Sequence, residues 1–411
     1  MTGDDGEREK LLLGGPPAST HTDRSYDVAH TRHVVDAIHE ATEAEHALRI
    51  TAGGGWLAAG RPTNAPTRRL DLRALRGIIE YNPGDLTLTA RAATPLAEIE
   101  EATRPHGQWL PLDPFGGESD TLGATLATAS CGPLASSLGL PRDVALGIEF
   151  VDGRGTVVRG GGRVVKNVAG FDLVRLNVGA WGTLGVITEV TVRLRARPEH
   201  ERTVALAVPD APAALDALLR ALRDLPLPPI AAELLSASLA ARAGAGSGAS
   251  DVVLVRLAGN SSSLAAQRGR LAALGNDCDV PATVWRALRS AFPPDASSFR
   301  LSQRPSKLAA LWTDLAASSR ELSGMLCHAS IERGVARCVV DSSQHRSLGS
   351  VVGALAPRWQ VIGEVLPAAA WSALAPAGAD SPAGADRLSA RVRAAFDPHT
   401  ILNPGLMAST P

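Results

Sequence analysis

The sequence predicts an α+β protein of two domains, with a C-terminal segment that returns to the first domain. The chain has 411 residues, 45% of them apolar, which is enough for two cores. Short β-rich runs and glycine clusters fill its first half, whereas alanine and leucine at helical spacing dominate the second. We expect a disordered tail at 1–25, a first domain at 26–198, an α+β cap domain at 199–385 and a C-terminal segment at 386–411.

The first domain is expected to contain alternating helices and strands. Residues 30–46 carry apolar side chains at helical spacing, and 47–55 form a strand that ends in a glycine turn. The stretch 69–107 predicts a helical turn, two strands around Asn82-Pro83-Gly84, and a helix. Residues 144–161 predict a hairpin, and 185–194 predict a strand with alternating inward and outward positions.

The second half is expected to be mainly helical, with some strands. We predict strands at 203–208, 252–257 and 335–340, loops at 241–250 and 372–387, and a helix at 388–396. The compact ending "FDPHTILNPGLM" follows this helix.

Charge and cysteine content exclude several classes of protein. The net charge of −1 removes the electrostatic reason to expect nucleic acid or an anionic membrane as a partner. The four cysteines form no CxxC pair, so we expect no metal or iron–sulfur site. No run approaches a membrane span of ~20 apolar residues, and the acidic N-terminus does not resemble a signal peptide. We expect a cytoplasmic protein, held at a membrane only through a partner.

Three glycine clusters in the first domain indicate a ligand that approaches the backbone closely. They lie at 51–55, 111–132 and 162–194. Glycine permits positive φ, and successive backbone N–H groups can cradle a diphosphate. The sequence contains neither a P-loop nor a G-x-G-x-x-G that follows a strand and opens a helix.

Three segments resemble one family of flavoproteins. They are "PLDPFGGESDTLGATLATASCGP", the run from "RDVALGIEF" through "VVKNVAGFDL" to "GTLGVITEVTVRL", and the ending "FDPHTILNPG". They are similar to the FAD-binding family of vanillyl-alcohol oxidase and p-cresol methylhydroxylase (PCMH) type, and within it to glycolate oxidase E subunits. The resemblance is strong over 26–200. It implies a two-lobed FAD-binding domain with a cap, and a diphosphate held between the lobes.

The resemblance also implies the residues that contact FAD. Those implied at the diphosphate and ribityl chain are Gly53, Gly54, Gly55, Thr121, Leu122, Gly123, Ser130 and Gly132. Those implied near the flavin ring or the adenine half are Pro111, Asp113, Lys166, Asn167, Gly185, Val186, Ile187 and Asn403.

Three positions depart from the family pattern. Ala124 replaces a second glycine, and Phe171 replaces a tyrosine. The first cluster has no histidine for covalent attachment, so we expect non-covalent FAD; Cys131 is expected to be a structural thiol. A scaffold subunit that has lost FAD is an alternative that rests on Ala124 and Phe171.

The substrate site is less well defined by the sequence. Oxidation of a 2-hydroxy acid needs a base and a cation for the carboxylate, and the cap offers His328 and Arg304 as candidates. The segment "HASIERGV" lacks the glycines and second histidine that related catalytic subunits have. We therefore expect an FAD-binding subunit of a glycolate oxidase complex that converts glycolate to glyoxylate only with a catalytic flavoprotein and an iron–sulfur subunit. The alternative is a stand-alone oxidoreductase of another 2-hydroxy acid or alcohol.

Overall fold

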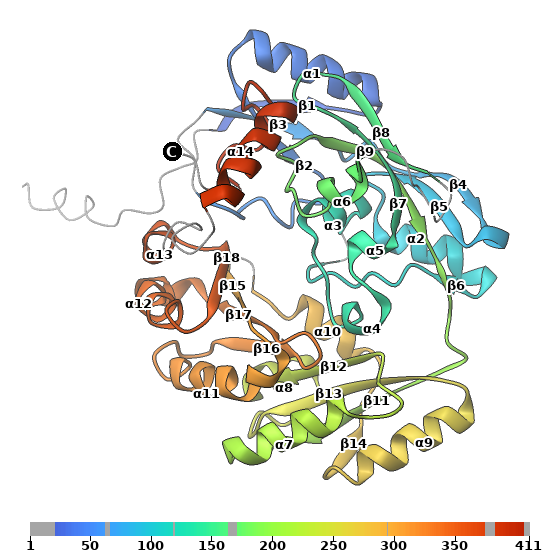
Figure 1. Cartoon of the computed structure of the whole chain (residues 1–411), viewed down its shortest axis with the longest axis vertical. Coiled ribbons are helices and arrows are strands. Elements are labelled where there is room, and N and C mark those ends of the chain that lie inside the picture. The colour runs from blue at the N-terminus through green and yellow to red at the C-terminus, as the bar shows by residue number, and fades with distance from the viewer. Residues whose placement is uncertain are drawn as a thin grey trace, which may run out of the picture.

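The computed structural model describes residues 21–61, 66–117, 120–162, 171–293, 295–374 and 383–406. Figure 1 shows two lobes, with the chain from β1 to β9 in one and the strands from β11 to β18 in the other. The helix near the C-terminus, α14 (Ala383–Phe396), lies on the first lobe, although the elements beside it come from the N-terminal half of the chain.

The first lobe contains two sheets. A parallel sheet has the order β1-β3-β2, and an antiparallel sheet has the order β4-β5-β9-β7-β8. The strands are β1 (His21–Asp27), β2 (Ala47–Thr51), β3 (Thr67–Asp71), β4 (Ile78–Asn82), β5 (Thr87–Arg91), β7 (Ala145–Val151), β8 (Val157–Gly161) and β9 (Val186–Arg193). The helices are α1 (Thr31–Glu43), α2 (Leu96–Thr103), α3 (Leu122–Thr128), α4 (Ala135–Leu138), α5 (Pro141–Val144) and α6 (Leu173–Asn177).

Most expected elements of this lobe are confirmed, but the predicted tail is too long. Helix α1 buries Val34, Ile38 and Ala41, as their helical spacing predicts. Residues 21–25, assigned to the tail, instead belong to β1, where Ser25 lies opposite Arg69 of β3. The polar sequence of β1 gives no alternation that would reveal a strand; its pairing with β3 does.

The second lobe is one eight-stranded antiparallel sheet in the order β14-β11-β13-β12-β16-β17-β15-β18. Its strands are β11 (His200–Ala207), β12 (Ala231–Leu235), β13 (Val252–Gly259), β14 (Asp277–Asp279), β15 (Ser297–Ser302), β16 (Leu326–Ser330), β17 (Val335–Val340) and β18 (Gln360–Val365). Its helices are α7 (Pro212–Arg223), α8 (Ala237–Ala243), α9 (Ser261–Ala272), α10 (Val284–Ser290), α11 (Leu308–Ser318), α12 (His345–Leu355) and α13 (Ala368–Ala373).

Two cores form on the two faces of this sheet. Apolar side chains of α7, α9, α11 and α12 pack on one face. The other face packs against α8 and α10 and also against Phe115, which comes from the first lobe. The strands predicted at 203–208, 252–257 and 335–340 are confirmed as β11, β13 and β17. Because Phe115 of the first lobe packs on the face that also contacts α8 and α10, the polar side chains on that face point toward the first lobe.

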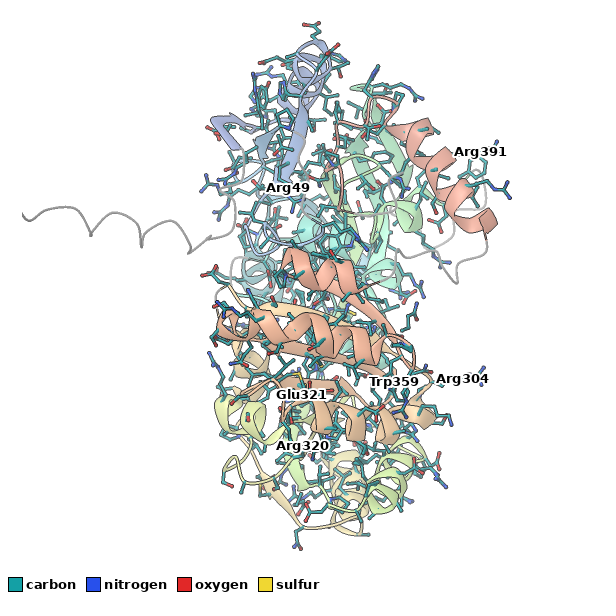
Figure 2. All side chains as sticks on the ribbon, turned by 90° about the vertical axis from the view of Figure 1, so that its left-hand side faces the viewer. Arg49, Arg304, Arg320, Glu321, Trp359 and Arg391 are labelled. Atoms are coloured by element: carbon teal, nitrogen blue, oxygen red, sulfur yellow. The ribbon has the colours of Figure 1, made fainter. Side chains whose placement is uncertain are left out.

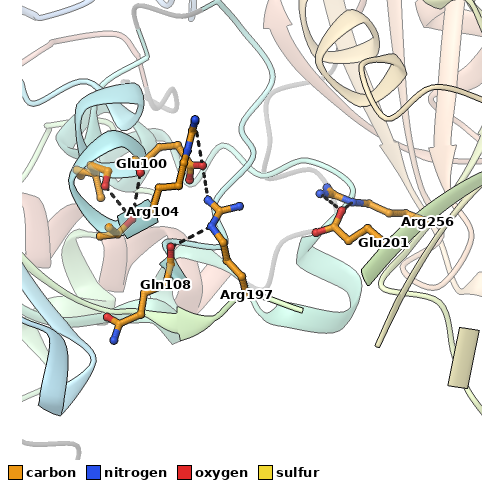
Figure 3. A network of polar contacts seen from close by, with 8 residues as sticks. Glu100, Arg104, Gln108, Arg197, Glu201 and Arg256 are labelled. Carbon is orange, nitrogen blue, oxygen red and sulfur yellow. Dashed lines mark hydrogen bonds and ion pairs between the residues drawn. The ribbon is translucent and has the colours of Figure 1, made fainter. Parts of the chain in front are cut away.

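The lobes are joined by polar and aromatic contacts at a short two-stranded antiparallel sheet of β6 (Gln108–Trp109) and β10 (Arg195–Ala196). Figure 3 shows Arg197, next to β10, paired with Glu100 of α2 and bonded to the carbonyl of Gln108. In the cap, Arg256 pairs with Glu201. Both arginines lie over the ring of Trp109, at 5.6 and 5.9 Å from its centroid. These contacts fix the connection between the two domains.

The C-terminal segment returns to the first lobe, as the sequence predicts. Leu402 forms a parallel bridge with Leu48 of β2, and the amide of Leu48 donates to the carbonyl of Ile401. Asp397 accepts hydrogen bonds from the amides of Ile401 and Leu402, which holds the turn that precedes the bridge. The segment thereby places Asn403 beside β2.

Candidate active site

A cavity of about 810 Å³ lies in the first lobe, where the two sheets meet. Eight of the residues that the resemblance implies line it: Gly53, Gly54, Gly55, Thr121, Gly123, Gly185, Ile187 and Asn403. We call it the flavin cavity below.

The glycines around the flavin cavity have two different roles. Gly54 has φ of +84°, and a Cβ there would meet only Leu57 at 3.7 Å, so the space beside it is open. A Cβ on Gly123 or Gly185 would instead collide with protein, with Ala92 at 2.6 Å and Phe150 at 2.4 Å respectively. The first glycine leaves room for a ligand, and the other two let the cavity wall pack.

Asn403 connects the wall of the flavin cavity to the C-terminal segment. Its Oδ1 accepts from the amide of Ile50 at 2.9 Å, and its Nδ2 donates to the carbonyl of Trp181 at 2.8 Å. The residue is buried with φ of +45°, a conformation that asparagine tolerates better than most residues. Asn403 thus joins β2 to the turn that contains Trp181.

Two ionisable residues line the flavin cavity. Arg49 of β2 donates to the carbonyls of Leu57 and Ala59 at 2.8 and 2.9 Å, and burial lowers its pKa. It holds the loop that follows Gly53–Gly55. Burial raises the pKa of Asp120 to about 6, against the opposing effect of Arg289 and Arg337. Its Oδ2 is buried with no hydrogen-bond partner among the described residues and so is available to a ligand.

A second cavity of about 490 Å³ adjoins the flavin cavity on the side of the cap. Trp56, Thr128 and Trp181 line both. The two tryptophan rings meet edge to face, with centroids 5.3 Å apart. The remaining walls are the loop 129–132 of the first lobe and the polar face of the cap sheet. We call this the substrate cavity, because its polar groups suit a small ligand beside the cofactor.

The polar face of the cap sheet follows from strand periodicity. Successive residues of β16 and β17 point to opposite faces, so Cys327 and Cys338 enter the core of the cap while His328 and Arg337 line the cavity. The register places His328 directly opposite Arg337, and Arg337 opposite Arg300 of β15. A row of ionisable side chains therefore crosses four neighbouring strands. Its members are Glu233 on β12, His328 on β16, Arg337 on β17 and Arg300 on β15.

Glu233 and His328 form a buried pair. Nδ1 of His328 lies 2.8 Å from Oε2 of Glu233. His328 is 4% exposed and Glu233 is 2% exposed. An ionised carboxylate can only accept, so beside an ionised Glu233 the Nδ1 atom carries the hydrogen, and Nε2 has a free lone pair whenever the ring is neutral. Nε2 is buried with no partner among the described residues. The ring of Phe115 lies 4.4 Å from that of His328, which fixes the orientation of the imidazole.

Arg300 and Arg337 share one carboxylate. Glu364 of β18 lies 2.7 Å from Nε of Arg300 and 2.6 Å from Nη2 of Arg337. Burial opposes the ionisation of Glu364, but the two guanidinium groups outweigh it and lower its pKa. Arg337 also lies over Phe115 at 4.7 Å and over Trp56 at 5.6 Å, both distances measured to the ring centroids.

Arg333 enters the substrate cavity from the turn between β16 and β17. Its Nη1 donates to Sγ of Cys131 at 3.1 Å, a contact between the two lobes. Nearby, the hydroxyls of Ser130 and Ser330 are buried and have no partner among the described residues. Buried polar groups without partners are rare, so these atoms are expected to bind a ligand or water.

The remaining predicted residues are distributed as follows. Ser130 and Gly132 line the substrate cavity, whereas Leu122 and Val186 are buried in cores and Pro111 is buried away from both cavities. Asp113 is half-buried, lies outside both linings and accepts from the amide of Leu134; desolvation raises its pKa to about 7, against the effect of Arg289. Lys166 and Asn167 lie outside the described residues.

Three further positions from the sequence analysis are placed by the structure. Arg304 is exposed, lies outside both cavity linings, and projects from the edge of the cap in Figure 2. This placement does not support Arg304 as the carboxylate anchor. Ala124 lines the flavin cavity. Phe171 is 92% exposed and lies outside the described linings of both cavities, so phenylalanine in place of tyrosine removes no hydroxyl from the described cavity walls.

Sequence reasoning missed most of the substrate cavity. The residues not anticipated are Trp56, Phe115, Glu233, Arg300, Ser330, Arg333, Arg337 and Glu364. Polar residues at alternate positions of otherwise apolar strands, as in "LCHAS" and "VARCVV", were the available signal.

Comparison with known proteins identifies the first lobe. Residues 26–161 match the family model of the FAD binding domain. This part of the chain is therefore an FAD-binding domain, as the sequence predicts. The cofactor that the glycine clusters predict is therefore FAD. The open space beside Gly54 and the unpartnered Asp120 oxygen in the lining of the flavin cavity fit a polar group that approaches the backbone closely.

The chain is similar to several curated flavoproteins over part of its length. It is 40% identical to the glycolate oxidase subunit GlcE of Escherichia coli over 166 residues, 40% of this chain and 47% of that protein. It is 30% identical to the glycolate oxidase subunit GlcD of Bacillus subtilis over 198 residues, 48% of this chain and 40% of that protein. The chain thus spans about half or less of the length of these relatives.

Solved structures share the fold of nearly the whole chain. A p-cresol methylhydroxylase with bound substrate superposes with a TM-score of 0.71 at 14% identity, over 93% of this chain and 88% of that one. An alkyldihydroxyacetonephosphate synthase gives 0.67 at 17% identity, over 92% and 75%. The expected two-domain α+β fold is therefore confirmed. Within the described residues, no helix is long and apolar enough to cross a membrane.

Proposed function

We propose that this chain is the FAD-binding subunit of a glycolate oxidase complex and that it oxidises a small 2-hydroxy acid, such as glycolate, in its substrate cavity. The observation that carries the proposal is the wall shared by the two cavities. Trp56, Thr128 and Trp181 line both. A small molecule in the second cavity would therefore lie next to a cofactor in the first.

The described residues supply the two groups that the reaction needs. His328 presents an unprotonated Nε2 to the cavity, so it can take the proton of the substrate hydroxyl. Glu233 holds the imidazole in that tautomer and stabilises the imidazolium that forms. The arginines of the cavity attract the carboxylate of the substrate. FAD, when bound, supplies a two-electron acceptor.

The cavity revises one expectation from the sequence. "HASIERGV" suggested a substrate site without a placed base, and hence a chain that oxidises glycolate poorly alone. Glu233, which lies 95 residues earlier in the sequence, supplies the hydrogen-bond partner for His328 that this segment lacks. The proposal therefore assigns the oxidation of the substrate to this chain, and the re-oxidation of the cofactor to other subunits.

The proposed partners are a second flavoprotein subunit and an iron–sulfur subunit. The similarity to subunits named GlcE and GlcD supports an assembly of several chains. The four cysteines of this chain contain no CxxC pair, so a cluster that carries electrons would belong to a partner. We propose a cytoplasmic location, with any contact to a membrane made by a partner.

A stand-alone oxidoreductase is the second candidate, and the substrate cavity favours it, because base and cations lie on one chain. Turnover assays with purified chain separate the two. With an artificial electron acceptor both candidates predict conversion of glycolate or another small 2-hydroxy acid. With oxygen as the sole acceptor, sustained turnover would support the stand-alone enzyme. Turnover restored only by the partner subunits would support the complex.

A further inference from the structure

The three arginines of the substrate cavity differ in their partners. Arg300 and Arg337 are both paired with Glu364. Arg333 has no carboxylate partner among the described residues, and its only hydrogen bond there is to Sγ of Cys131. Sulfur is a weak acceptor, whereas a carboxylate forms a strong, charge-assisted bond with guanidinium. A carboxylate that entered the cavity would therefore replace the thiol as the partner of Arg333.

The charges of the cavity also limit the charge of its ligand. Among the described residues, the lining contains Arg300, Arg333 and Arg337 against Glu233 and Glu364, which gives one net positive charge when the His328 ring is neutral. A monoanion makes this lining neutral. A dianion leaves a net negative charge in a buried site, which is costly.

We infer that the cavity selects 2-hydroxy acids with a single carboxylate, and that Arg333 anchors this carboxylate. The inference rests on the proposed function and narrows its substrate class. Arg333 sits in a well-defined turn: the amide of Gly334 donates to the carbonyl of Ser330, and the carbonyl of Gly334 accepts from Gln303. The unpartnered hydroxyls of Ser130 and Ser330 offer further donors to the same ligand.

Two unreactive acids test the inference by binding alone. 2-Hydroxy-2-methylpropanoate has one carboxylate, 2-hydroxy-2-methylbutanedioate has two, and neither has a hydrogen on the hydroxyl-bearing carbon, so neither can be oxidised. Titration calorimetry of each acid into the FAD-loaded full chain gives its Kd. We expect the monocarboxylate to bind more tightly than the dicarboxylate.

Variants of Arg333 assign the anchor. Arg333→Met should weaken binding of the monocarboxylate by about 10- to 100-fold, the usual effect of losing a hydrogen bond to a charged group. Arg333→Lys should retain part of the affinity. Arg304→Met is the matched control. Arg304 is an exposed arginine and is the other candidate for binding the carboxylate. Flavin content and Tm of each variant show that it is folded.

The outcomes separate this inference from the proposed function. Unchanged affinity in Arg333→Met, a large loss in Arg304→Met, or tighter binding of the dicarboxylate would overturn the inference while leaving a 2-hydroxy acid site in place. If the wild-type chain carries FAD but binds neither acid, the proposed substrate cavity itself is wrong.

Discussion

Glu233 accepts a hydrogen bond of 2.8 Å from Nδ1 of His328, and this contact defines which nitrogen of the ring faces the substrate cavity. The two residues lie on the neighbouring strands β12 and β16. A carboxylate that orients an imidazole is a common way to prepare a base, because it fixes the tautomer and stabilises the protonated ring.

His328→Gln should lower kcat for glycolate by about 10²- to 10⁴-fold, the usual contribution of a general base. Glutamine can still donate to Glu233 but offers no basic nitrogen. Glu233→Gln should have a smaller effect, because the imidazole is no longer held in its tautomer. The measurement is turnover with an artificial acceptor across a pH series.

His200→Gln is the control for this pair, because His200 is exposed at the start of β11 and lies outside both cavities. Its kcat should equal that of the wild type. Equal activity of wild type and His328→Gln, at equal flavin content, would exclude His328 as the base.

Gly54→Val should lose FAD without unfolding the cap. Valine strongly disfavours the φ of +84° at this position, and its side chain would occupy open cavity space. Gly185→Val should instead lower Tm, because its Cβ would collide with Phe150. Flavin absorbance and thermal unfolding distinguish the two effects, and a Gly54→Val protein with normal flavin content would show that this loop does not hold the cofactor.

The FAD should be released when the purified protein is denatured by acid or heat. The cluster Gly53–Gly55 is followed by Trp56 and contains no histidine that could attach the cofactor. The test is precipitation of the protein followed by an absorbance spectrum of the supernatant. Flavin that remains with the precipitated chain would indicate a covalent bond.

Asp113→Asn should stabilise the protein at and above neutral pH. Burial raises the pKa of Asp113 from 3.8 to about 7, against the effect of Arg289. Between these values the folded state keeps a proton that the unfolded state has lost, so the free energy of unfolding falls as pH rises, by on the order of a few kcal/mol for this group. Asparagine can still accept from the amide of Leu134 and carries no charge.

The measurement is Tm of both proteins from about pH 4 to about pH 8, where the linkage predicts a gap that widens with pH. Asp210→Asn, at an exposed position, should follow the wild type. A gap that is constant over this range would contradict a raised pKa at Asp113.

The sequence predicted the FAD-binding domain well because its signals are local. Glycine clusters, the hairpin at 144–161 and the C-terminal ending each occupy one short stretch, and Asn403 of that ending lines the flavin cavity. Strand β1 was missed because a polar strand acquires its structure from the neighbour it pairs with, here β3.

The substrate cavity could not be predicted in the same way, because sheet register assembles it. Glu233 and His328 meet only because β12 pairs with β16, and nothing local to either strand encodes that pairing. The sequence gives no reason to prefer Arg333 to Arg304, whereas the structure places Arg333 in the lining of the substrate cavity, beside Cys131 of the other lobe, and Arg304 outside it.

Anaerobic mixing of the FAD-loaded chain alone with glycolate tests the central claim most directly. The account predicts that the visible absorbance of the oxidised flavin disappears without any partner subunit, because the base, the cations and the cofactor cavity belong to one chain. D-lactate and L-lactate serve as further monocarboxylate substrates, and dithionite shows that the flavin can be reduced. Flavin that stays oxidised with all three acids, but is bleached by dithionite, would contradict the assignment of substrate oxidation to this chain.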